Sequence, residues 1–230
     1  MSFIAHSIHC RSILISSSVE ITLADGTKVE HQVPDDIDWH WFSENGYLDA
    51  TSGEEAWDWV QPIKSIQFRT PLVGDFTLDK CLTVEAVNLS KNTKSIGESA
   101  FYRCVNLKTI AGLDNVTSIG DWAFDRCLKL RLDHLPPNLT RMGKGAFANC
   151  ELLVGDIEIP SGVTEIGEQT FVNCTGITGI TIHSGVESIG EIAFEGCTSL
   201  TRLTFSGKTK EQVLAMENAP WGVDPDIINA

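Results

Sequence analysis

The sequence has few basic side chains for its 230 residues. Seventeen lysines and arginines stand against 31 aspartates and glutamates, which gives a formal net charge of −14 at pH 7. Nucleic acids and anionic membrane surfaces both require a stripe of Lys and Arg, so this imbalance argues against either as a partner. The charge favours solubility and a basic or neutral partner.

Long hydrophobic runs are also missing. No stretch approaches the ~18–20 consecutive apolar residues that a membrane-spanning helix needs, so membrane insertion is not expected. The first ten residues, Met1 to Cys10, have neither the basic start nor the long apolar centre of a secretory signal, and no signal peptide is expected in this sequence. The apolar share of 42% is ordinary for a globular protein.

Catalytic motifs are absent as well. The sequence has no Gly-x-Ser-x-Gly elbow, phosphate-binding loop, His-Glu-x-x-His or dinucleotide fingerprint. A solvated surface explains the abundant carboxylates before a glycosidase pair does. We therefore expect no enzyme and no cofactor, with a hydrolase that uses acidic residues as a remote alternative.

What the sequence does contain is a repeat. Six of its seven cysteines recur at steps of 23, 23, 23, 24 and 23 residues: Cys81, Cys104, Cys127, Cys150, Cys174 and Cys197. An Ile-Gly pair or its equivalent precedes each cysteine, from Val73-Gly74 in the first copy to Ile189-Gly190 in the last. A phenylalanine lies three residues before the cysteine in five copies: Phe101, Phe124, Phe147, Phe171 and Phe194. The first copy has Leu78 at that position.

Each copy predicts one coil of a solenoid. After the cysteine, a Leu-x-x-Leu-x-Leu pattern such as Leu200–Phe205 indicates a short strand with one buried face. The Val-x-x-Ile-Gly-x-x-Ala-Phe segment then has apolar residues three or four apart, which suits a helical or 3₁₀ return path. Stacked coils would form a parallel sheet, with the Phe and Ile columns in the core and glycine permitting close approach. One copy, Leu130–Pro137, leaves the strand register unclear.

The ends are expected to cap this solenoid. Residues 1–72 read as a small β-rich cap or docking domain, with a hairpin about Asp25-Gly26 and a first rung at Lys64–Phe68. Residues 73–205 hold the six repeats. Residues 206–230 read as a helical cap and tail, with a helix from Thr209 to Asn218 and Trp221 packing back.

The cysteines read as buried core residues. Stacked side chains that point the same way rarely satisfy the geometry of a disulfide, so free thiols are preferred over inter-coil bridges. Zinc is not expected, because no Cys-x₂-Cys pair is present. His6, His9 and Cys10 form the one cluster of soft ligands, and it lacks a fourth partner.

Two surfaces are candidates for binding. The first is the acidic stretch between Lys28 and Lys64, which holds Trp39, Trp41, Trp57 and Trp59. In strands, each Trp pair would share a face and serve either as a binding anchor or, the preferred interpretation, as the core of the cap. Asp35, Asp36 and Asp38 in the same stretch lack the loop pattern of a calcium-binding EF-hand.

The second surface is the outer face of the predicted sheet, because solenoids commonly bind along such a face. Its residues are mostly small and polar, without aromatics: Asn88, Thr109, Asp156, Glu158, Thr181, His183, Arg202 and Thr204.

The repeat resembles the BspA-like family of leucine-rich repeats, whose copies read approximately Ile-Gly-x-x-Ala-Phe-x-x-Cys-x-x-Leu-x-x-Ile-x-Ile-Pro. The resemblance covers residues 73–205 and implies a non-enzymatic recognition module, as found in bacterial surface proteins, some protists and phage-associated proteins. It suggests a cell-surface or extracellular location. We expect a recognition or adhesion module for a protein or glycan. The alternative is a structural subunit of a larger assembly, such as a virion or surface complex, with residues 1–72 docking.

Overall fold

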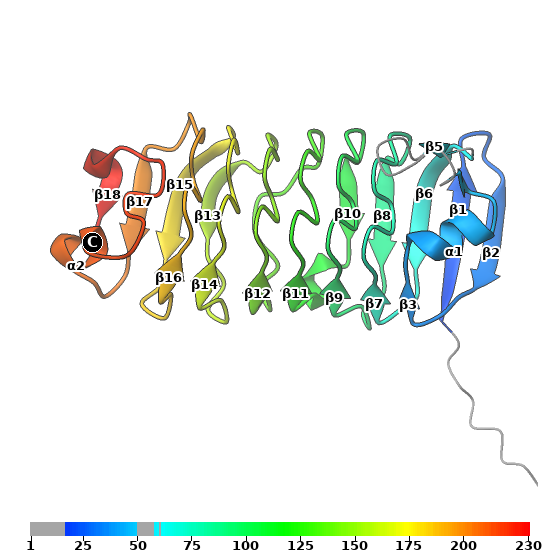
Figure 1. Cartoon of the computed structure of the whole chain (residues 1–230), viewed down its shortest axis with the longest axis horizontal. Coiled ribbons are helices and arrows are strands. Elements are labelled where there is room, and N and C mark those ends of the chain that lie inside the picture. Colours follow the sequence, from blue (N-terminus) through cyan, green and yellow to red (C-terminus); the bar gives the residue numbers. More distant parts are fainter. Residues whose placement is uncertain (1–16, 50–57, 60) are drawn as a thin grey trace, which may run out of the picture.

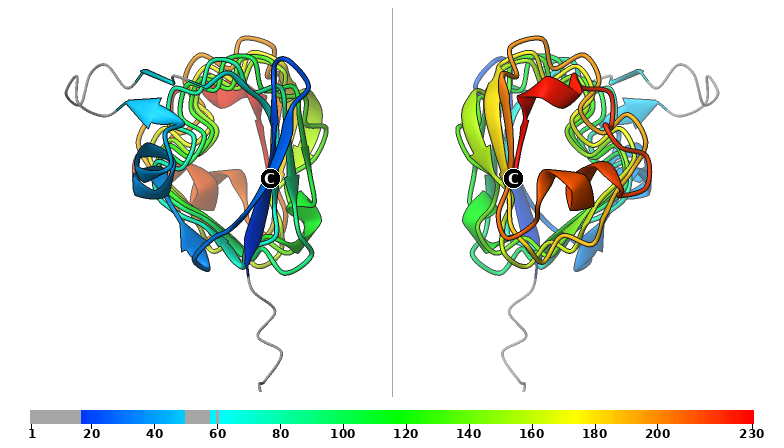
Figure 2. Two further views of the ribbon diagram at one scale, coloured as in Figure 1. Left: turned by 90° about the vertical axis from the view of Figure 1, so that its right-hand side faces the viewer. Right: turned by 90° about the vertical axis from the view of Figure 1, so that its left-hand side faces the viewer.

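The computed structural model describes residues 17–49, 58–59 and 61–230, and every structural statement below concerns these residues. The chain winds into an elongated solenoid whose short strands stack along one axis (Figure 1). Viewed down that axis, the coils superpose into a ring around the core (Figure 2). The leucine-rich-repeat solenoid predicted from the cysteine spacing is confirmed.

One side of the ring is a sheet of longer strands, here called the long-strand sheet. Its parallel strands include β6 (Ile63–Phe68), β8 (Ala86–Leu89) and β10 (Thr109–Ala111). After an interruption it continues as β13 (Gly155–Glu158), β15 (Ile177–Ile182), β17 (Arg202–Phe205) and β18 (Ile228–Asn229). The register places Ile66, Val87 and Ile110 side by side, facing the core.

A second side, the short-strand sheet, carries the Ile-Gly positions. Its two-residue parallel strands are β3 (Asp36–Ile37), β7 (Leu72–Val73), β9 (Ser95–Ile96), β11 (Ser118–Ile119) and β12 (Arg141–Met142), then β14 (Glu165–Ile166) and β16 (Ser188–Ile189). These strands hydrogen-bond across coils and not along the chain. The residue before each glycine therefore points into the core once in every coil.

The third side, the turn wall, corrects the expected helical or 3₁₀ return path. The Ile-Gly-x-x-Ala-Phe segments form isolated turns, such as Cys104 N–H to Phe101 O at 3.1 Å, and no continuous helix. Ser99 and Arg103 have positive φ angles of 50° and 56°, so the backbone does not continue as a helix. Their N–H groups instead donate to the carbonyls of Asp121 and Asp125 in the next coil, both at 2.8 Å.

Two columns fill the core. The five phenylalanines stack nearly parallel, with successive centroids 5.2, 5.6, 5.9 and 6.0 Å apart. The six described cysteines are free thiols. Five of them donate to a carbonyl of the preceding coil, for example Cys127 Sγ to Phe101 O at 3.2 Å. The column position is therefore occupied by a small side chain with one weak hydrogen-bond donor.

The N-terminal end contains the predicted hairpin and an additional coil. β1 (Ser18–Leu23) and β2 (Lys28–Gln32) are antiparallel to each other, and β1 is antiparallel to β6. β6 is the expected first rung, since it pairs in parallel with β8. Through β3, Ile37 pairs with Val73, and Phe42 in α1 (Trp39–Glu44) is fully buried. Coils therefore begin before residue 73.

The C-terminal end is covered by a short helix and an irregular tail. α2 (Lys210–Leu214) starts at a capping box of Thr209 and Gln212 and is shorter than the segment expected to be helical. Trp221 is 1% exposed and lies 5.6 Å from Phe205 between ring centroids. Its carbonyl accepts the Phe194 N–H at 3.1 Å, as the next coil would. Among the described residues, no helix has the length and apolar character to span a membrane.

Candidate binding surface

The long-strand sheet is interrupted between β10 and β13. The intervening copy contains Pro136 and Pro137, which lack a backbone N–H and cannot donate to a sheet ladder. Within the described residues, this copy contributes a single isolated bridge, Leu132 to Leu153, and no strand. The irregular copy noted in the sequence is therefore a gap in the sheet.

The gap exposes part of the core. Ile110 faces inward at the same position as Val87 and Ile157, which are each 1% exposed, yet Ile110 is only half-buried. A pocket of about 240 Å³ opens there, with Ile110, Leu113, Leu132 and Pro136 among its lining residues. The gap therefore combines an opening in the sheet with largely apolar walls.

The rim of the gap is charged. His134 Nδ1 lies 2.5 Å from Asp133 Oδ1, and its Nε2 lies 3.7 Å from Asp114 Oδ1. The hydrogen bond to Asp133 raises the pKa of His134 above its usual value. Because all three side chains are well exposed, the cluster supplies polarity at the rim more than stability.

Seven of the eight sheet-face residues lie on strands of the long-strand sheet. Asn88 and Thr109 are exposed on the N-terminal side of the gap, and Asp156 and Glu158 on the C-terminal side. Thr181 and Thr204 continue the row of Glu158, while Arg202 Nη2 contacts Asp156 Oδ2 at 2.5 Å across Gly179. The sequence did not reveal the gap between the two groups.

The eighth residue, His183, lies elsewhere. It follows β15 in a turn, where its Nε2 is 3.1 Å from Pro160 O and its Nδ1 accepts the Gly185 N–H at 3.1 Å. A turn residue held by these backbone contacts is at the edge of the sheet and not on its face.

The tryptophans do not form the expected strand pairs. Trp39 and Trp41 are in α1, where residues two apart point to different sides. Trp41 packs edge-on against His31 at 5.1 Å, and Trp59, in the two-residue β5 (Asp58–Trp59) paired with β4 (Leu48–Asp49), packs against Phe42 at 5.5 Å. Trp39, Trp41 and Trp59 are partly buried against the core. Trp57 lies outside the described residues.

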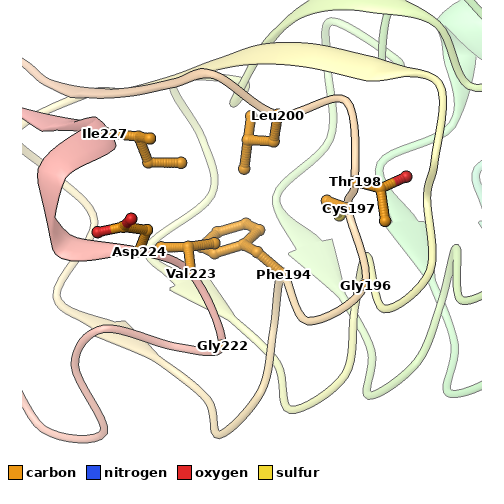
Figure 3. A pocket seen from close by; sticks show the side chains of 9 residues that line it. All are labelled: Phe194, Gly196, Cys197, Thr198, Leu200, Gly222, Val223, Asp224 and Ile227. Atoms are coloured by element: carbon orange, nitrogen blue, oxygen red, sulfur yellow. The ribbon is translucent and has the colours of Figure 1, made fainter.

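Another apolar pocket lies at the C-terminal end, where the tail meets the last coil. It has a volume of about 220 Å³, and Phe194, Cys197 and Leu200 face Val223 and Ile227 across it (Figure 3). These residues continue the core columns. The pocket is therefore the unfilled end of the core, where the tail replaces a full coil.

The short-strand sheet has a larger, polar depression of about 530 Å³ near Arg141 and Lys144. Both of its cations are in ion pairs, since Arg141 Nη2 lies 3.7 Å from Asp121 Oδ1 and Lys144 Nζ lies 2.8 Å from Glu168 Oε2. This arrangement offers less to a partner than the gap does.

Burial keeps the thiols of the cysteine column in their neutral form. Burial raises the pKa of Cys81 to about 11 and that of Cys197 to about 12, so the thiolate that acts as a nucleophile or metal ligand is disfavoured. In the described part of the chain, no three His, Cys, Asp or Glu side chains converge on a metal position. Asp38 instead caps α1 through His40 N–H. His6, His9 and Cys10 lie outside that part.

Stacked short parallel strands, one coil per 23–24 residues, define a leucine-rich-repeat solenoid. The BspA type leucine rich repeat region matches residues 52–154 and 153–213, with six copies. The chain belongs to this BspA-type leucine-rich-repeat family. Such repeats form protein-interaction modules, and the family and its structural relatives are non-enzymatic repeat proteins.

Two solved structures are similar to this chain. A leucine rich cell surface protein from Faecalibacterium prausnitzii A2-165 is 30% identical with a TM-score of 0.58, over 64% of this chain and 40% of that one. A leucine-rich repeat protein from Eubacterium ventriosum shares the fold at 24% identity and a TM-score of 0.52, again over 64% and 40%. The chain thus spans 40% of the length of each. A comparison with curated proteins finds no match.

Proposed function

We propose that this protein is a recognition module for a protein partner and that the partner lies across the long-strand sheet, with an apolar side chain in the gap between β10 and β13. The half-buried Ile110 carries this proposal, because Val87 in the preceding coil and Ile157 beyond the gap are sealed from solvent at the same position. An apolar anchor surrounded by polar contacts is the usual arrangement at a protein interface.

The sheet-face residues fit the role of the surrounding contacts. Thr109 precedes the gap, and Asp156 and Glu158 follow it, so polar groups are available on both sides of the pocket. The same proposal places this recognition at the cell surface, because the similar Faecalibacterium protein is described as a cell surface protein. Adhesion would follow from recognition of a partner on another cell.

The test blocks the gap without disturbing the sheet. Ala111 is exposed and lines the pocket, so the indole of Ala111→Trp fills it. The control Ala86→Trp places the same side chain on the same face of the neighbouring strand β8, opposite Thr109 and therefore away from the pocket. Peptides selected on the wild-type protein from a displayed random library serve as the probe. We expect them to carry an apolar anchor and to bind Ala111→Trp at least about tenfold more weakly, as loss of a hot-spot contact does.

Ala86→Trp should retain the binding of the selected peptides. Equal binding to wild type and Ala111→Trp would show that the gap is not the binding site. Light scattering on the wild-type protein separates recognition from the assembly alternative, because a structural subunit would form a defined oligomer at the concentrations used for the binding measurements.

A further inference from the structure

A column of three cations runs along the turn wall. Lys80, Arg103 and Arg126 occupy the same position in three consecutive coils, each with a positive φ between 54° and 60°. Their N–H groups donate to the carbonyl of the residue just before the equivalent position in the following coil, as Lys80 does to Tyr102 O at 2.7 Å. Because these backbone bonds stack the three positions on consecutive coils, the three residues form one short stripe.

An aliphatic column lies two residues further along each of these coils. It consists of Leu82, Val105 and Leu128, and Leu82 is 52% exposed, which makes it one of the few large exposed hydrophobic residues in the described chain. Val105 and Leu128 are partly exposed. The first three repeats therefore present cations beside apolar side chains.

The fold does not require these residue types. In the last three repeats the cation position holds Asn149, Asn173 and Gly196, and the aliphatic position holds Glu151, Thr175 and Thr198. The first three repeats, residues 73–141, also carry nine basic and eight acidic side chains and are therefore close to neutral, although the whole chain has a net charge of −14. Because the negative charge of the chain is nearly absent from these repeats, the column of cations favours an anionic partner here.

The spacing identifies the shape of that partner. On this side of the core, the ring centroids of Phe101 and Phe124, in the second and third coils of the column, are 5.2 Å apart, and those of Phe124 and Phe147, in the third and fourth coils, are 5.6 Å apart. One turn of an α-helix rises ~5.4 Å. A helix that lies along the solenoid axis therefore offers one carboxylate and one apolar residue per turn to each coil.

We propose that the turn wall of the first three repeats is a second interaction surface, which binds an acidic amphipathic helix of a protein partner. The guanidinium of Arg103 lies over the Tyr102 ring at 5.4 Å, and Arg126 Nε is 4.0 Å from Asp125 Oδ2. A guanidinium has five N–H donors, so these contacts leave groups for a carboxylate in a two-bond arrangement. Three turns, or about 11 residues, cover the column.

The probe is a synthetic 18-residue peptide with Glu and Leu recurring at helical spacing, and its affinity is measured by fluorescence anisotropy against the full chain. Removing the three charges together, as Lys80→Gln, Arg103→Gln and Arg126→Gln, should weaken binding about tenfold or more. The matched control removes three exposed lysines from other sites, as Lys91→Gln, Lys94→Gln and Lys108→Gln, and should keep the affinity within about twofold.

Further measurements test whether binding needs a helical peptide, a charged peptide and the apolar column of a folded protein. A peptide with Gln for Glu, and one with two central prolines, should each lose binding, and Leu82→Asp in a folded protein should reproduce the loss. Equal weakening by both triple variants, or unchanged binding of the proline peptide, overturns the proposal. The wild-type protein is also tested for co-sedimentation with phosphatidylserine vesicles. If it binds these vesicles and not the acidic peptide, and the Lys80, Arg103 and Arg126 triple variant loses vesicle binding, the column contacts a lipid surface and the proposal is overturned.

Discussion

At the scale of single residues, the buried polar atoms explain the repeated cysteine. Phe101 O accepts the N–H of Cys104 in its own coil at 3.1 Å and the thiol of Cys127 in the next. A carbonyl oxygen has two lone pairs, so both bonds are compatible. Cysteine is small enough for the column and offers one weak donor to that second lone pair, which explains its recurrence without disulfide or metal chemistry.

Asp79 is the opposite case, a buried carboxyl whose Oδ1 has no hydrogen-bond partner. Burial raises its pKa to about 6, with Lys80 and Arg103 opposing the shift. The folded state therefore holds its proton more tightly than the unfolded chain, in which the pKa of aspartate is about 4. Stability is lost as the pH rises from about 4 to above 6.

We predict that Asp79→Asn removes this loss. Relative to wild type, the variant should gain about 1–3 kcal/mol in free energy of unfolding between pH 4 and pH 7. Urea titrations at a series of pH values measure both proteins. Parallel pH profiles would mean that Asp79 titrates alike in the folded and unfolded states.

At the scale of the elements, the glycines of the short-strand sheet set how closely the coils approach. A Cβ built at Gly120 would lie 2.6 Å from the backbone of Glu98 and of Gly97 in the preceding coil. The backbone cannot yield as a flexible side chain can. The glycine is needed here for close approach and not for a positive φ.

Gly120→Ala should therefore destabilise the protein by about 1–3 kcal/mol, the usual range for an overpacked core. Gly167 is the matched control in the same column. It follows the one 24-residue step, and its nearest contact would be 3.1 Å, so Gly167→Ala should be milder. Thermal unfolding of both variants checks the order. A larger loss for Gly167→Ala would contradict the close-approach explanation.

The coils could be predicted from the sequence, whereas the gap in the long-strand sheet and the conformation of the turns could not. The 23-residue period marks the same buried position in each copy, so the solenoid and its Phe column could be predicted. The return path was misjudged because apolar spacing of three or four also fits a helix, whereas non-glycine residues such as Ser99 and Trp122 adopt positive φ and bond to the next coil.

The first coil was missed for a different reason. Ile37 and Phe42 keep the five-residue interval of Ile96 and Phe101, but Asp38 stands at the glycine position and no cysteine follows. The binding surface depends on contacts between coils. The exposure of Ile110 results from the missing neighbouring strand, which a period in the sequence does not report.

At the scale of the whole molecule, the two sheets are interrupted at different places. The long-strand sheet stops between β10 and β13, and the short-strand sheet between β12 and β14. The turn wall continues across both interruptions, through Phe124 N–H to Ala146 O at 2.9 Å at the first and Phe147 N–H to Thr170 O at 3.0 Å at the second. The phenylalanine column is continuous there too. Coupling between the halves therefore depends on Phe147 and its neighbours.

Phe147→Ala should separate the unfolding of the two halves. Phe101→Ala is the matched control, because Phe101 is equally buried and the short-strand sheet joins its coil to both neighbours through β7, β9 and β11. Each substitution should cost about 3–5 kcal/mol, as truncation of a buried phenylalanine does. Only Phe147→Ala should broaden the transition into two steps, because neither sheet bridges its coil fully to both neighbours. Calorimetry measures this as a van't Hoff enthalpy well below the calorimetric one, and a single sharp transition in Phe147→Ala would show that the turn wall alone couples the halves.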